Sequence, residues 1–290
     1  MERRTTFTKR DVLVFLGCVT FLLANLGAIG AGGRRLAKEM LCLSNLKEWG
    51  TCFSLYASDY NGYFGPSASS EHDKWFNWLR PYYSPGETLW NAGKPVKMNR
   101  LLLCPAASSK FWSDQTNGNF PQTQSTFIAW GVFKPTAQNT WQVWGACGSY
   151  GANAWAASIP NVGMDRDKYW QTINVDGGEN IPLLADCTTW GGRPLSDSIA
   201  TLNPPEWDGH WYDGSLPPYG TAISIARFAL NRHTEGSNCL FFDLSARKVG
   251  LKENWTLKWE QKFNTSNRWT KAGGVEPNDW PEWMRDFKEY

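Results

Sequence analysis

The sequence has few histidines and lacks the common catalytic and metal-binding motifs. It contains 3 histidines, and none of them lies in an H-E-x-x-H pattern. It has no G-x-S-x-G segment, no phosphate-binding glycine loop and no C-x-x-C pair. The formal net charge of +2 is too small to indicate nucleic acid, and no linker or internal repeat divides the chain. We therefore expect no enzyme activity, no metal or other cofactor, and no nucleic-acid partner.

What the sequence does have begins with a long apolar run near its N-terminus. No charged residue lies between Asp11 and Arg34. At about 1.5 Å per residue, the run from Val12 to Ile29 is long enough to cross a hydrocarbon core. A cleaved secretory signal is the alternative, because basic residues precede the run and small residues follow it, but the run exceeds a typical signal core. The sequence therefore predicts a membrane helix.

The segment that follows this run predicts an amphipathic helix. Apolar residues recur there at helical spacing: Leu36, Met40, Leu43, Leu46 and Cys52 to Phe53. The helix is expected to end near Asp59, Asn61 and Gly62, which form a turn sequence. These residues resemble the opening of a calcium loop but lack its distal glutamate, so an Asx-type turn is the simpler interpretation.

The rest of the chain changes character. Short apolar runs bounded by turn residues predict strands at Leu101–Leu103, Ile181–Ala185 and Cys239–Phe242. The predicted fold is α+β, with an antiparallel sheet and long loops packed against the stalk helix. Residues 1–33 would form the leader and the transmembrane half of that helix, and residues 34–290 would form a head that includes its amphipathic half.

The N-terminal junction resembles the processing site of prepilins, which a peptidase cuts and methylates. Three residues fall on matching positions: Phe7, Thr8 and Asp11. The resemblance implies that Asp11 replaces a glutamate whose carboxylate meets the N-terminus of a neighbouring subunit. Thr6 stands where the family has glycine before the cut, and Lys9 and Arg10 are charged where it is apolar. Two outcomes stay open, cleavage before Phe7 or an uncut anchor.

Later segments resemble a pilin-like family of planctomycete and verrucomicrobial bacteria. The matching pieces appear in the family's order: Cys42–Gly50, Leu55–Phe64, Leu102–Pro105, Gly148–Asn153, Pro182–Asp186 and Asn231–Asp243. His233 and Asp243 match the C-terminal H-x9-D-G element, although Leu244 replaces its glycine. The resemblance implies a structural protein of a type IV pilus or a type II secretion-like system. Its expected partners are the inner membrane, other pilin-like subunits and assembly proteins.

Cysteine usage indicates an exported head. Of 7 cysteines, Cys18 lies in the apolar run and the others lie beyond it: Cys42, Cys52, Cys104, Cys147, Cys187 and Cys239. An even number fits an oxidising compartment, so we place the N-terminus inside and the head in the periplasm or on the cell surface, after a single pass through the inner membrane. The family signature implies a Cys42–Cys104 disulfide. The remaining cysteines could be paired or could be buried thiols.

The 18 tryptophans allow two interpretations. They could fill the core of a head that is poor in leucine and isoleucine, or exposed indole faces could stack on a polysaccharide. A surface-anchored carbohydrate-binding protein is therefore the main alternative function, and an exported hydrolase is a weaker one. The residues concerned are Trp75, Trp78, Trp90, Trp112, Trp130, Trp141, Trp144 and Trp155 in the middle of the head, and Trp255, Trp259, Trp269, Trp280 and Trp283 in the tail.

The strongest candidate for a catalytic or metal site in the sequence combines His233, Asp186 and Asp243. A structural role is the preferred interpretation. His233 and Asp243 would act as clamps at opposite ends of one buried strand, about 30 Å apart and unable to share a metal ion.

Overall fold

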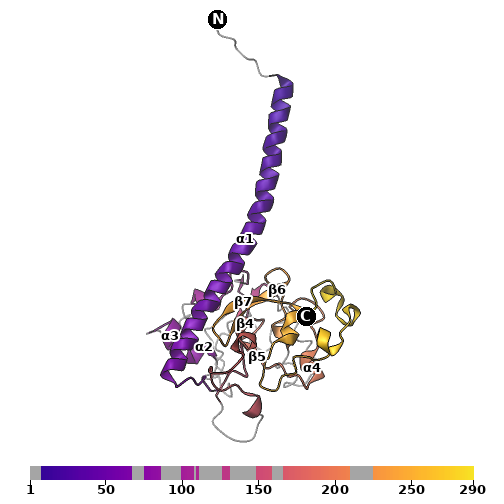
Figure 1. Cartoon of the computed structure of the whole chain (residues 1–290). Helices are drawn as coiled ribbons and strands as arrows, with labels where there is room; N and C mark the ends of the chain where they lie inside the picture. Colours follow the sequence, from indigo (N-terminus) through magenta and orange to yellow (C-terminus); the bar gives the residue numbers. More distant parts are fainter. Residues whose placement is uncertain are drawn as a thin grey trace, which may run out of the picture.

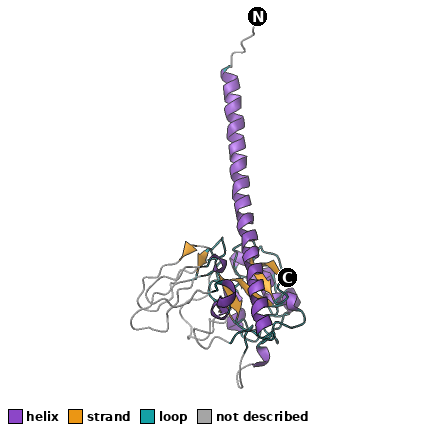
Figure 2. Cartoon of the chain, turned by 90° about the vertical axis from the view of Figure 1, so that its left-hand side faces the viewer, coloured by secondary structure: helices purple, strands orange, loops and turns teal. Residues whose placement is uncertain are grey.

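A long helix and the head built around its C-terminal end form the two parts of the structure. This computed structural model describes residues 8–66, 75–85, 99–107, 109–110, 126–130, 148–158, 166–209 and 225–290. Helix α1 (Lys9–Asp59) has 51 residues, and its N-terminal part projects away from the head (Figures 1 and 2). The remaining elements are α2 (Trp75–Trp78), α3 (Arg80–Tyr83), η2 (Arg100–Leu102), β1 (Ser109–Lys110), β2 (Ile128–Ala129), β3 (Tyr150–Asn153), η3 (Arg166–Lys168), η4 (Gly178–Asn180), β4 (Pro182–Asp186), β5 (Gly191–Gly192), α4 (Ile199–Leu202), η5 (Ile225–Arg227), β6 (Gly236–Phe241), β7 (Ala246–Gly250), η6 (Lys252–Thr256), η7 (Lys271–Gly273), η8 (Pro277–Asp279) and η9 (Glu282–Met284).

Local sequence sets both ends of α1. Thr8 and Asp11 form a capping box, in which each side chain accepts from the other residue's backbone N–H. The helix continues without a break through its glycines at Gly30, Gly32 and Gly33. It ends where Asn61 (φ 54°) and Gly62 (φ 83°) enter the left-handed region. The predicted continuous helix and its turn are confirmed.

The projecting part of α1 exposes apolar side chains on all sides. Val12, Leu13, Val14, Phe15 and Leu16 are all exposed, and five consecutive positions cover more than one full helical turn. Among the residues whose side chains are described, however, no helix is long and apolar enough to cross a membrane.

The head contains a five-stranded sheet in the order β5-β3-β4-β6-β7. Most neighbours are antiparallel, but β3 and β5 pair in parallel, so the sheet is mixed and the prediction of an antiparallel sheet is wrong at this edge. A Cβ atom on Gly191 would lie 2.5 Å from the carbonyl oxygen of Ala152, so this pairing requires glycine. The strand predicted at Leu101–Leu103 is also wrong, because a 3₁₀ turn capped by the Asn99 side chain forms there.

One face of the sheet is covered by the C-terminal part of α1. The helix buries a narrow face composed of Cys42, Leu46, Trp49, Phe53 and Tyr56, whereas Leu36 and Met40 of the predicted apolar stripe are exposed. Close contact is possible because a Cβ atom on Gly50 would lie 3.2 Å from Leu240 of β6. The predicted packing of sheet against stalk helix is therefore confirmed for the second half of α1.

The other face of the sheet is covered by the C-terminal segment, which consists of short 3₁₀ turns. Alternate residues of β6 point to the two faces, so that Leu240 packs in the core beside α1 and Phe241 packs in the core beside the tail. The tail core contains four tryptophans: Trp255, Trp259, Trp269 and Trp280. The sheet thus forms the middle layer between α1 and the tail.

Candidate functional site

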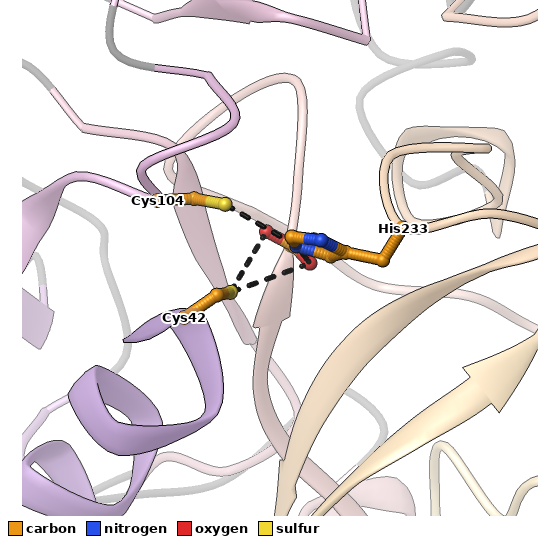
Figure 3. Close-up of side chains that lie close together, drawn as sticks. Cys42, Cys104 and His233 are labelled. Carbon is orange, nitrogen blue, oxygen red and sulfur yellow. Dashed lines mark hydrogen bonds and ion pairs between the residues drawn. The ribbon is translucent and has the colours of Figure 1, made fainter. Parts of the chain in front are cut away.

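Four side chains from distant parts of the chain converge where α1 enters the head. Cys42 lies on the buried face of α1, and Cys104 follows η2. Asp186 ends β4, and His233 precedes β6. Figure 3 shows Cys42, Cys104 and His233 pointing toward one another. All four residues are buried, and one ligand atom from each lies within 4.8 Å of the others. We call these four residues the junction cluster.

Direct contacts link the members of the junction cluster. The imidazole Nε2 of His233 lies 3.3 Å from Cys104 Sγ and 3.2 Å from Asp186 Oδ2. Cys42 Sγ donates to the same carboxylate, at 3.7 Å from Oδ1 and 3.8 Å from Oδ2. The carboxylate therefore faces both the thiol from the helix and the imidazole from the loop before β6.

A buried arginine neutralises this carboxylate. Arg232 Nη1 donates to Asp186 Oδ1 at 2.8 Å, and both side chains are fully shielded from solvent. Arg232 also donates to the carbonyl oxygens of Thr126 and Ser149, each at 2.6 Å. The backbone N–H of Asn238 donates to Asp186 Oδ2 at 2.8 Å. These bonds fix the orientation of Asp186, because a buried carboxylate is costly unless charge and hydrogen bonds compensate for lost water.

Neighbouring polar groups also orient the two thiols. The hydroxyl of Tyr150 donates to Cys42 Sγ at 3.4 Å. The backbone N–H of Cys104 donates to the Ser149 hydroxyl oxygen. Both neighbours belong to the segment that enters β3, so the sheet holds the cysteines as well as the carboxylate.

The electrostatic environment separates the pKa values of the cluster. Burial, the hydrogen bond with Cys104 and the charge of Asp186 raise the pKa of Cys42 well above its usual range. Burial also opposes ionisation of Cys104, but hydrogen bonds from Cys42 and His233 outweigh it and lower the pKa to about 7. Burial disfavours the charged forms of Asp186 and His233, yet the charges of Arg232 and His233 lower the pKa of Asp186, and Asp186 raises the pKa of His233 to about 10.

This group of atoms has two chemical uses. Two thiols, an imidazole and a carboxylate are the donor types that Zn²⁺ takes in proteins, and four protein ligands would leave no open coordination position. Two neighbouring thiols can also be oxidised to a disulfide. Both cysteines are free thiols in the structure, so the predicted Cys42–Cys104 bond is not formed, although the predicted proximity is present.

The structure separates the two residues of the H-x9-D-G element, as the sequence predicts. Asp243 lies in the turn after β6, where its carboxylate accepts from the backbone N–H of Ser245 at 2.9 Å. Leu244 adopts φ 64°, the left-handed conformation for which glycine is best suited. The imidazole of His233 contacts Asp186 and Cys104, and its backbone N–H closes the turn before β6, onto Gly236.

The N-terminal processing residues are only partly described. Thr6 and Phe7 lie outside the described residues. Asp11 is exposed and accepts from both the N–H and the hydroxyl of Thr8, at 2.9 and 2.7 Å. At the other end of α1, Asp59 accepts from the Tyr82 hydroxyl at 2.7 Å. These observations give Asp11 and Asp59 structural roles within a single chain.

The sequence interpretation placed Cys42 with Cys104 and His233 with Asp186, but it did not bring these two pairs together into one cluster. The available signal was the resemblance itself, since each of the four residues lies in a separate matching segment. Of the other cysteines, Cys52, Cys187 and Cys239 are buried free thiols, and Cys147 lies outside the described residues.

The tryptophans in the described part of the chain mainly fill the core. Nine are buried: Trp49, Trp75, Trp130, Trp155, Trp170, Trp255, Trp259, Trp269 and Trp280. Most of their ring N–H groups donate to carbonyl oxygens, as Trp49 does to Leu101 at 2.9 Å. Within the described ranges only Trp207 has a largely exposed side chain, at 52%. Four other tryptophans of the sequence interpretation lie outside the described residues: Trp90, Trp112, Trp141 and Trp144.

Comparisons with protein-family models, curated proteins and solved structures gave no match for this chain.

Proposed function

We propose that this chain is a membrane-anchored pilin-like or pseudopilin-like structural protein of a type IV pilus or type II secretion-like system, without catalytic activity. The observation that carries the proposal is the form of α1. It runs unbroken from Lys9 to Asp59, its second half is built into the head, and its first half projects from the head (Figure 1). This is the arrangement that the sequence resemblance implies for a subunit that can be stored in a membrane and packed into a helical assembly.

The exposed apolar side chains on the projecting half of α1 indicate that this half requires an apolar environment. A helix that is apolar on every side is stable only inside lipid or among other apolar helices. Residues 12–16 and 21–23 include eight exposed large apolar side chains: Val12, Leu13, Val14, Phe15, Leu16, Phe21, Leu22 and Leu23. We propose that the inner membrane supplies this environment before assembly and that copies of α1 supply it within an assembly.

The capping box favours the uncut form of this protein. Thr8 and Asp11 satisfy each other, which stabilises the first turn of α1 while the preceding residues are still attached. In an assembling pilin, the matching carboxylate is expected to meet the new N-terminus of a neighbour. Because Asp11 already has partners here and Thr6 replaces the glycine before the cut, we infer a static anchor with an intact Met1.

Membrane fractionation tests the anchor. Full-length protein should stay with the membranes after alkaline washing, and the double variant Phe21→Lys/Leu22→Lys should move to the soluble fraction. Two lysines at the centre of a membrane helix would cost about 5–7 kcal/mol, at about 2.5–3.5 kcal/mol each. The matched control is Leu36→Lys/Leu41→Lys, which replaces two exposed residues nearer the head and should leave fractionation unchanged. Release of the wild-type chain by the wash would refute the anchor.

The mass of the mature N-terminus tests processing. We expect an intact Met1 in the wild type, and in Thr6→Gly we expect cleavage with an N-methylated Phe7 when the prepilin peptidase is present. A methylated Phe7 in the wild type would contradict the static anchor and support filament assembly.

A further inference from the structure

We infer that the junction cluster binds a structural zinc ion that fastens α1 to the sheet. The ligands would be the Sγ atoms of Cys42 and Cys104, one carboxylate oxygen of Asp186 and Nε2 of His233. This inference goes beyond the proposed function, since it concerns the joint between helix and head and not the membrane or the assembly.

The spacing of the ligand atoms fits a tetrahedral zinc ion. With Zn–S near 2.3 Å and Zn–N and Zn–O near 2.0–2.2 Å, neighbouring ligand atoms in a tetrahedron lie about 3.3–3.8 Å apart. The observed separations are 3.3 Å between Cys104 Sγ and His233 Nε2, 3.8 Å between Cys42 Sγ and Asp186 Oδ2, and 3.2 Å between His233 Nε2 and Asp186 Oδ2. Three ligand pairs therefore already lie close to the separations that a bound zinc ion requires.

The charges also fit a divalent cation. Zinc binding displaces the protons held by the two thiols and by the ligating nitrogen of His233, so two thiolates balance the two positive charges of the ion. The Asp186 carboxylate is balanced by Arg232, and a ligating imidazole is neutral. The buried group therefore has no net charge with zinc bound, which a buried site requires to avoid a large desolvation cost.

The groups around the ligands complete the arrangement that protein zinc sites use. Ligating side chains are usually oriented by hydrogen bonds from a surrounding layer of residues. Here Tyr150 donates to Cys42, and Arg232 and Asn238 donate to Asp186. Because all four ligand positions come from the protein and all four residues are buried, the ion would have a structural and not a catalytic role.

A zinc ion at this position would connect four segments that the sequence keeps far apart. It would connect α1 to the segment after η2, to the end of β4 and to the loop before β6, at the point where α1 leaves the head. A disulfide between Cys42 and Cys104 would connect only two of them.

The test is the metal content of the full-length chain, purified in mild detergent from cells grown without added zinc. We expect one zinc ion per chain by elemental analysis. Cobalt exchanged into the site should give the visible absorption and the thiolate charge-transfer bands of a tetrahedral ion with sulfur ligands. Removing zinc with a strong chelator should lower Tm by about 5 °C or more.

Variants separate this site from adventitious zinc. Cys42→Ala and His233→Ala should each lose the zinc ion, and Cys52→Ala, which removes another buried thiol of α1, should keep it. If the first two variants fail to fold, the cobalt spectrum of the wild type still decides whether sulfur ligands are present. Zinc that remains in both variants, or a wild-type chain without zinc, would overturn the inference. The inference would also be overturned if reduction before alkylation increased the number of alkylated cysteines by two, because this would reveal a disulfide. None of these results depends on whether the chain is membrane-bound.

Discussion

The buried ion pair between Arg232 and Asp186 offers the sharpest test of how the head is held together. Replacing Arg232 with Met keeps most of the side-chain volume but removes the charge partner of Asp186 at 2.8 Å and leaves only His233, at 3.2 Å, beside the carboxylate. Breaking a buried pair from one side costs about 3–5 kcal/mol, because the remaining charge stays buried. Arg232→Met also removes the donor to the Thr126 and Ser149 carbonyls. We therefore expect the free energy of unfolding to fall by at least about 3 kcal/mol.

Urea unfolding of the full chain in mild detergent, followed by tryptophan fluorescence, measures this loss. Chelator and reductant in every sample keep metal and disulfide effects out of the comparison. A double-mutant cycle with Asp186→Asn should show that the two losses are not additive, with a coupling of about 2–3 kcal/mol. Lys262→Met is the control, because Lys262 and Asp167 form a surface pair with side chains 60% and 57% exposed, and such pairs contribute less than about 1 kcal/mol. A cost below about 1 kcal/mol for Arg232→Met, or an additive cycle, would refute this account.

Three further predictions concern α1 and the turn after β6. Leu244→Gly should be about 1 kcal/mol more stable than Leu244→Ala in the same urea assay, because both lose the same side-chain packing but only glycine accepts φ 64° without strain; equal stability would contradict this. Burial and the charge of Tyr60 raise the pKa of Tyr56, and burial and the bond to Asp59 raise that of Tyr82, both to about 12. Because the folded state favours the protonated phenols, their contribution to stability is complete below pH 10 and should be lost as the pH rises toward 12. Replacing both tyrosines with phenylalanine should reduce this loss in unfolding curves measured at alkaline pH. Trp49→Ala should lower the free energy of unfolding by about 3–5 kcal/mol, because the fully buried indole fixes α1 to the head, and Trp49→Phe should cost clearly less by the same assay.

Features that depend on neighbouring residues could be predicted from the sequence. The helical course of α1 and its end at Asp59 follow from apolar spacing and from the turn residues Asn61 and Gly62. The strands β4 and β6 follow from short apolar runs between turn residues. The use of tryptophans as core residues follows from a head with few other large apolar side chains. For the helix and the strands, the energy that selects the local structure comes largely from residues within a few positions of one another.

Features that depend on the order of the strands were decided only by the tertiary structure. The parallel pairing of β5 with β3 rests on the absence of a Cβ atom at Gly191, close to Ala152, a contact between residues distant in sequence. The apolar stripe on α1 was predicted too close to the N-terminus. The sheet contacts α1 as far as Glu39, through Asn238 and Lys248, and Leu36 and Met40 stay exposed.

The junction cluster shows most clearly the difference between what the sequence predicts and what the tertiary structure decides. The sequence by itself supplied a cysteine in the stalk helix, another after an apolar run, an aspartate at a strand end and a histidine before the last buried strand. It could not show that Cys42 meets Asp186 across 144 residues, or that His233 faces both Cys104 and Asp186. Those contacts exist because β4 lies next to β6 in the sheet and α1 packs across that face. The sequence thus determined which chemical groups are present, and only the packing of helix on sheet determined that they share one buried site.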